Sequence, residues 1–310
     1  MSNDDWVHVP ARARPRREGG WRDAFWHYLL GTVLIIGGGL ILNMGLLALF
    51  KATGHADVVV LLGHEGTGTI AVGDRLLAFA YLMLSLIVFL PLMRIVLPAL
   101  HQRPWASFVS AGRWRWGRLA RSLIVMAGLL LATIAIQLVF APRSLHYEGH
   151  WHEIGLFALA ALVLAPLQVF TEEVFFRGYL MQAIARATPL ALLQIVIPAV
   201  LFTGAHAQNP EALQGAAWAV ASYASAGFYL GLLTLYDRGI ESAVGAHLAI
   251  NLFAILVVGS SASVSPSSVI WRDAAPDYRL GFLSGLVVFA LHFAILVWAR
   301  RRKDVGESQR

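Results

Sequence analysis

Long apolar runs separated by short polar segments dominate the chain. Runs of about 20 residues are long enough to cross a bilayer as a helix. Such runs lie near 25–50, 76–100, 119–141, 154–176, 189–207, 215–236, 240–259 and 280–299. The pattern predicts an all-α, polytopic integral membrane protein with about eight transmembrane helices.

Composition and charge agree with this prediction. Of the 310 residues, 58% are hydrophobic and 14% are charged, which excludes an ordinary soluble domain. The net charge of +6 would suggest a nucleic-acid partner in a soluble protein. Here the basic residues concentrate before residue 25, between 101 and 121 and after 299, as expected for cytoplasmic segments of a membrane protein. We therefore predict a multi-pass protein of the cell membrane with both termini in the cytoplasm, whose partner is the lipid bilayer rather than nucleic acid.

Four regions follow from the same pattern. We expect a basic cytoplasmic tail (1–24), an N-terminal transmembrane region (25–153), a core that carries the candidate chemistry (154–259), and a last helix with a basic tail (260–310). The apolar run after the first tail is too long for a signal-peptide core, so the tail is expected to stay attached. The chain has no cysteine, which excludes disulfides, thiolate metal sites and cysteine nucleophiles.

Two loops carry polar patterns of their own. The inner loop 101–118 interleaves Trp105, Trp114 and Trp116 with arginines, which is typical of the lipid headgroup region. The outer loop 142–153 holds three histidines and two glutamates, and we expect it to be solvated, with a metal site as the alternative. These side chains are His146, Glu148, His150, His152 and Glu153. Further along, Gly227 and Gly231 stand four apart and predict a close helix-packing face.

The stretch Thr171–Leu180 (TEEVFFRGYL) places two acids and an arginine in a run that otherwise spans the membrane. Ionisable residues are costly there, so they mark a functional site by default. On a helix, Glu173 and Arg177 have the spacing and order of a favourable ion pair. Glu172, about 100° around the helix, is left without a local partner. It is therefore our candidate general base, with a structural salt-bridge cluster as the alternative.

Two further polar pairs have helical spacing. Phe202 and His206 are four residues apart, and so are His247 and Asn251, so each pair shares one helix face. A hairpin at Thr188–Pro189 would place Glu172 and His206 at similar depth, because they are nearly equidistant from the turn. Straight parallel helices would put His247 about 10 Å nearer the inner face. Helix tilt, breaks at Pro166 and Pro198, or a fourth helix that projects into the cytoplasm could remove this mismatch.

A base, a histidine that shares its proton and two donors are the parts needed to activate water and stabilise an oxyanion. The motifs Glu172-Glu173-x-x-x-Arg177, Phe202-x-x-x-His206 and His247-x-x-x-Asn251, in this order, resemble the type II CAAX prenyl protease and bacteriocin-processing (CPBP) family, also called the abortive infection family. The resemblance covers about 154–259 and includes all seven motif positions.

The resemblance implies an intramembrane glutamic endopeptidase whose substrate is a membrane-associated peptide or protein. Glu172 and His206 would activate the water, and His247 and Asn251 would form the oxyanion site. Glu173 and Arg177 would organise the helix, with Phe202 in support. We favour a reaction without a metal cofactor, with zinc held by Glu172, His206 and His247 as the alternative. A non-catalytic scaffold or immunity protein and a proton-coupled transporter also remain open.

Overall fold

The computed structural model describes residues 25–55, 57, 70–141, 143–260 and 263–308. The predicted basic tail 1–24 lies outside these residues. The α-helices are α1 (Phe25–Ala52), α2 (Val72–Ile87), α3 (Phe89–His101), α4 (Trp116–Phe140), α5 (Trp151–Glu173), α6 (Met181–Ala187), α7 (Ala191–Ala205), α8 (Pro210–Asp237), α9 (Glu241–Leu256) and α10 (Tyr278–Ser308). A 3₁₀ helix, η5 (Trp105–Phe108), and a π-helical segment, η6 (Val174–Leu180), complete the helical elements. The predicted all-α membrane fold is confirmed.

Each predicted apolar run lies on a helix or on consecutive helices. Six helical stretches among the described residues are long and apolar enough to cross a membrane, and α7 and α9 are shorter apolar helices. The stretch α5–η6–α6 runs without a break for 37 residues from Trp151 to Ala187. At about 1.5 Å per residue it is far longer than the hydrocarbon core of a bilayer, as the option of a projecting fourth helix anticipated.

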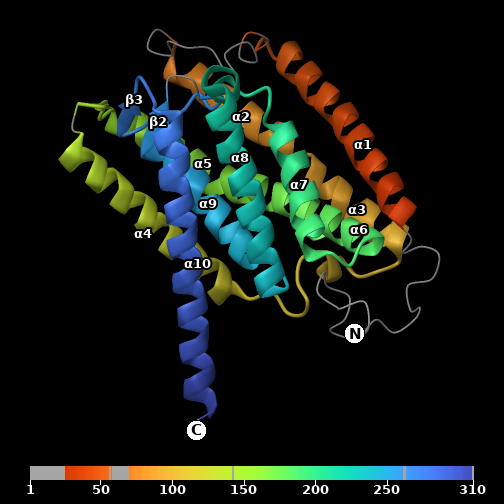
Figure 1. The fold of residues 1–310 in the computed structure, drawn as a ribbon. Helices are drawn as coiled ribbons and strands as arrows, with labels where there is room; N and C mark the ends of the chain where they lie inside the picture. The colour runs from red at the N-terminus through yellow and green to blue at the C-terminus, as the bar shows by residue number, and fades with distance from the viewer. Residues whose placement is uncertain (1–24, 56, 58–69, 142, 261–262, 309–310) are drawn as a thin grey trace.

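The helices form a bundle whose outer surface is rich in large apolar side chains. Figure 1 shows α1 along one edge of the bundle, and α10 extending beyond the other helices at its C-terminal end. Exposed Val33, Ile41 and Met44 on α1 and Ile136 and Val139 on α4 are typical of this surface. Since lipid is the solvent for such side chains, these faces are those of a multi-pass integral membrane protein.

A small sheet lies at one end of the bundle, where α4 ends and where α5 and α10 begin. Strands β1 (Leu145–Tyr147), β3 (Trp271–Asp273) and β2 (Val258–Ser260) are neighbours in that order, with β1–β3 antiparallel and β2–β3 parallel. Glu148 forms an ion pair with Arg272, and Glu153 forms one with the buried Arg75. The predicted solvation of loop 142–153 holds for His146, His150 and His152, which are exposed, whereas strand pairing and ion pairs keep Glu148 and Glu153 partly buried.

The inner loop 101–118 also packs against protein more than its composition suggested. Arg115 donates to Glu241 Oε2 at 2.9 Å, and Arg118 donates to Asp237 Oδ1 at 3.2 Å. The prediction that these arginines face lipid headgroups was wrong, because the buried carboxylates at the α8–α9 junction need counter-charges. Trp116, which is 72% exposed, and the exposed Arg113 keep the character of a lipid interface.

This loop also removes the predicted depth mismatch of His247. Val109 O accepts a hydrogen bond from Ile240 N at 3.0 Å, and Ser110 pairs with Gly239 in an isolated bridge. Glu241, the first residue of α9, is completely buried beneath the loop. Because α9 begins inside the protein, His247 can lie at the level of Glu172 and Glu173.

Glycines allow the closest helix contacts. A Cβ atom at Gly227 would lie 3.1 Å from Ala199 Cα, and one at Gly231 would lie 2.9 Å from Ile195 Cγ2, which confirms the predicted packing face between α8 and α7. The tightest approach in α9 is at Gly245, where a Cβ would lie 2.3 Å from Leu119 O of α4. The backbones of α4 and α9 therefore touch beside the candidate site.

We predict that Gly245→Ala destabilises the protein by about 1–3 kcal/mol, because a backbone atom cannot move aside as a side chain can. Gly285→Ala in α10 is the matched control, since no atom lies within 4 Å of its added Cβ and alanine favours helices. Thermal unfolding in detergent would measure both. Equal unfolding temperatures for the two variants would contradict the close α4–α9 contact.

Candidate active site

The buried acids lie at the end of α5, where the helix changes character. Glu172 is 9% exposed and Glu173 is fully buried. The α-helix becomes a π-helix at Val174, the next residue. Such π-helical turns are rare and often occur at functional sites, because the extra residue re-aims the side chains around it. The motif acids thus lie at the point where the helix widens.

Arg177 neutralises Glu173, as the spacing predicted. Its Nη1 donates to Glu173 Oε1 at 2.8 Å, and both side chains are buried. Arg177 Nη2 also donates to Gly227 O at 3.3 Å, and the guanidinium lies 4.4 Å from the ring centroid of Phe202. The arginine therefore binds one acid, one carbonyl group and the ring of the second motif.

His247 lies between the two glutamates. Its Nδ1–H group donates to Glu173 Oε1 at 2.7 Å, and its Nε2 lies 3.6 Å from Glu172 Oε2. The hydrogen bond to Glu173 fixes the orientation of the imidazole, as second-shell carboxylates do for histidines in many sites. This role of Glu173 was not predicted from the sequence, because a contact between α5 and α9 joins residues far apart in the chain and produces no regular spacing.

Glu172 keeps one oxygen atom without a hydrogen bond to protein. Its Oε2 is buried and has no hydrogen-bond partner among the described residues. Buried carboxylate oxygens are normally satisfied, so an exception that faces an imidazole is informative. Glu173 Oε2 also lacks a partner, but the other oxygen of Glu173 is held by Arg177 and His247, so Glu172 Oε2 is the better placed to accept a proton from a group that enters beside His247.

Asn251 faces the same region, held by a residue that the sequence analysis did not single out. Its Nδ2 donates to Gln168 Oε1 at 3.0 Å, and Gln168 is 3% exposed. Gln168 precedes Glu172 by one helical turn, so both lie on one face of α5. The position of Gln168 four residues before the candidate base was the feature of the sequence that could have identified it. The predicted common face of His247 and Asn251 is confirmed.

The contacts of His206 are with aromatic rings and a backbone carbonyl group rather than with the acids. Its Nδ1–H group donates to Phe202 O at 2.8 Å, and its ring packs 4.3 Å from Phe202 and 4.6 Å from Tyr223, between centroids. Within the described part of the chain, His206 makes no hydrogen bond or ion pair with Glu172. The structure thus brings Glu172, Glu173, Arg177 and His247 together, with Phe202 as the link to His206.

The arrangement does not fit the zinc alternative. Catalytic zinc sites have three protein ligands that converge on one point. Across the described ranges, no group of three or more histidine, aspartate or glutamate side chains could hold a metal ion, either in the core or in the outer loop.

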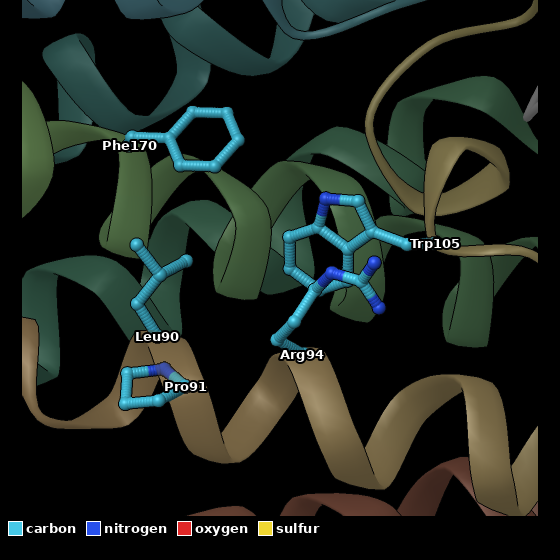
Figure 2. Close-up of a pocket in the computed structure, with 5 residues that line it drawn as sticks. All are labelled: Leu90, Pro91, Arg94, Trp105 and Phe170. Carbon is cyan, nitrogen blue, oxygen red and sulfur yellow. The ribbon is translucent and has the colours of Figure 1, made fainter.

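A separate pocket lies on another side of α5. Leu90, Pro91 and Arg94 of α3, Trp105 of η5 and Phe170 of α5 line a volume of about 310 Å³. Figure 2 shows the Arg94 side chain beside the Trp105 ring, with Phe170 above Leu90. Phe170 and Glu172 are two residues apart, or about 200° around the helix. The pocket is therefore not part of the cluster of motif residues.

Comparison with known proteins agrees with the motifs. Residues 153–253 match the model of the family described as type II CAAX prenyl endopeptidase Rce1-like. The family resemblance is confirmed. The matched segment includes every motif residue from Glu172 to Asn251, and it spans the helices from α5 to α9 that build the cluster.

A relative from Bacillus subtilis (strain 168), the uncharacterized protein YyaK, is 33% identical over 165 residues. The aligned part is 53% of this chain and 55% of the relative, so the chain spans about half the length of the relative that it matches. No solved structure matches the chain.

We predict that Arg177→Ala destabilises the protein by about 3–5 kcal/mol, because it leaves Glu173 buried without a counter-charge. Arg177→Lys should recover only part of this loss, since a single ammonium group cannot reproduce the guanidinium contacts with Glu173, Gly227 and Phe202. Unfolding in detergent would measure both variants. Arg113→Ala, at an exposed position, is the control and should change stability by less than about 0.5 kcal/mol. A stable Arg177→Ala protein would contradict a structural role for the buried pair.

Proposed function

We propose that the protein is an intramembrane endopeptidase that hydrolyses a peptide bond in a membrane-associated peptide or protein, with water activated by Glu172 and no metal ion. One observation carries the proposal. Glu172 Oε2 has no hydrogen-bond partner and lies 3.6 Å from Nε2 of a histidine that the Glu173–Arg177 pair holds in place. The family match over 153–253 supports the same reaction class.

The roles of the residues follow from what each can donate or accept. Glu172 accepts a proton from water, and the resulting hydroxide attacks the carbonyl carbon of the scissile bond. Negative charge then develops on the carbonyl oxygen, where Asn251 Nδ2 and a protonated Nε2 of His247 can donate hydrogen bonds. The proton returns to the leaving nitrogen as the bond breaks.

His206 is proposed to share this proton with Glu172. Its Nδ1–H group is used by Phe202 O, so Nε2 carries the lone pair that can accept a proton. Catalytic hydrogen bonds are often long in a free enzyme and tighten when substrate binds. We therefore expect His206 and Glu172 to approach one another around a bound peptide.

Pairing of the other buried acids favours hydrolysis over proton transport. A transporter needs a relay of ionisable groups that exchange protons along a path. Glu153 is paired with Arg75, Asp237 with Arg118, and Glu241 with Arg115. Each of these carboxylates forms an ion pair with an arginine, whereas Glu172 forms none with an arginine of the described residues, so the Glu172 cluster is the better candidate for chemistry.

The central experiment is cleavage of a library of membrane-anchored peptides by purified protein in liposomes. We expect Glu172→Gln to lower kcat about 10²–10⁴-fold, because glutamine cannot take the proton of water. Glu148→Gln, which alters a carboxylate in the outer sheet, is the matched control and should cleave like wild type. Equal activity of wild type and Glu172→Gln would overturn the assignment, and activity in neither would favour a scaffold.

Treatment with a chelator tests whether the reaction needs a metal ion. We expect full activity after treatment with a chelator, because Glu172 and His247 supply the base and the donor without a cation. The readout is the initial rate of cleavage before treatment, after treatment, and after zinc is returned. Loss of activity that zinc restores would establish the zinc-dependent alternative instead.

A further inference from the structure

Two aromatic rings pack against the His206 ring. The ring centroid of Phe202 lies 4.3 Å from that of His206 and the centroid of Tyr223, from α8, lies 4.6 Å from it, with interplanar angles of 40° and 30°. The hydrogen bond from Nδ1 to Phe202 O fixes the remaining rotation of the imidazole. The two rings and the hydrogen bond together restrict the orientation of the imidazole, and so the direction in which its Nε2 atom points.

Tyr223 is itself fixed through its hydroxyl group. The hydroxyl donates to Glu211 Oε1 at 2.7 Å and accepts from Asn209 Nδ2 at 3.0 Å. Glu211 Oε2 accepts from Val264 N at 3.2 Å, which ties the group to the segment after β2. Buried tyrosines commonly anchor their hydroxyl in this way, and the anchor determines where the ring lies.

Asn209 lies in the same turn as His206, and Glu211 follows it in the first turn of α8. Asn209 N donates to His206 O at 3.1 Å, and α8 begins at the next residue, Pro210. In a straight helix, Glu211 and Tyr223 would be about 18 Å apart along the axis, too far for their side chains to meet. The first part of α8 therefore bends back toward Tyr223, and the hydrogen bonds maintain this bend.

We propose that Tyr223 is a positioning residue for His206, with Asn209 and Glu211 fixing Tyr223. The inference rests on the proposed peptidase function, in which the imidazole of His206 must be correctly oriented to share a proton with Glu172. Tyr223 acts through His206 and does not itself exchange a proton with the substrate. Displacement of a catalytic group by about 1 Å can lower the rate about 10²-fold, so loss of the ring should affect turnover.

A double-mutant cycle tests this role. We expect Tyr223→Leu to lower kcat about 10–100-fold with KM within about twofold, and Tyr223→Phe, which keeps the ring but loses the anchoring hydroxyl group, to cause a smaller loss than Tyr223→Leu. In the His206→Ala background, Tyr223→Leu should cause no further loss, because the residue acts only through the imidazole. Equal losses in both backgrounds, or unchanged kcat in Tyr223→Leu, would overturn the proposal. Unfolding temperatures of the variants show whether each is folded.

A second measurement needs no substrate. NMR of protein with labelled histidines gives the shifts of the His206 ring protons, identified by their loss in His206→Ala. Neighbouring aromatic rings displace these shifts, so Tyr223→Leu should move them, and Tyr223→Phe, which keeps a ring without its anchor, should move them less. Unchanged shifts in Tyr223→Leu would overturn the positioning role. Full cleavage by His206→Ala would instead reject the catalytic assignment of His206, and the NMR result would stand separately.

Discussion

The buried ion pair of Arg177 and Glu173 is the interaction on which the centre of this protein depends. Removing both charges from water is costly, and the cost is offset only where further hydrogen bonds complete the pair. Glu173 accepts a second hydrogen bond from His247, and Arg177 adds the carbonyl group of Gly227 and the ring of Phe202. This one pair thereby connects α5 and η6 to α7, α8 and α9, and all the helices that carry the motifs contact it.

The membrane explains why the other charges are arranged as they are. Ionisable groups away from water must be paired, and Glu153, Asp237 and Glu241, toward the two ends of the bundle, are each matched by an arginine. Glu172 differs, because no arginine of the described residues pairs with it and its Oε2 lies 3.6 Å from the imidazole of His247 without a hydrogen bond. The paired charges make a rigid frame, and Glu172 inside it is the group that we propose to be reactive. Preorganisation of this kind is what electrostatic catalysis requires.

Local spacing predicted much of this molecule. Apolar length located the helices, and i,i+4 spacing placed Arg177 on Glu173 and gave His247 and Asn251 a common face. Contacts between distant segments were not predictable in this way. The hydrogen bond from His247 to Glu173, the partner Gln168, the ring of Tyr223 beside His206 and the packing of loop 101–118 all join elements far apart in sequence. The π-helical turn after Glu173 likewise has no spacing signature.

The most direct test of the central claim is an experimental structure of the Glu172→Gln protein with a cleavable membrane-anchored peptide bound. We predict that the scissile carbonyl carbon lies beside the side chain at position 172. The carbonyl oxygen should lie within about 3 Å of Asn251 Nδ2 or His247 Nε2. A peptide that binds elsewhere, for example only along the pocket of Arg94 and Trp105, with no backbone carbonyl near these groups, would contradict the claim.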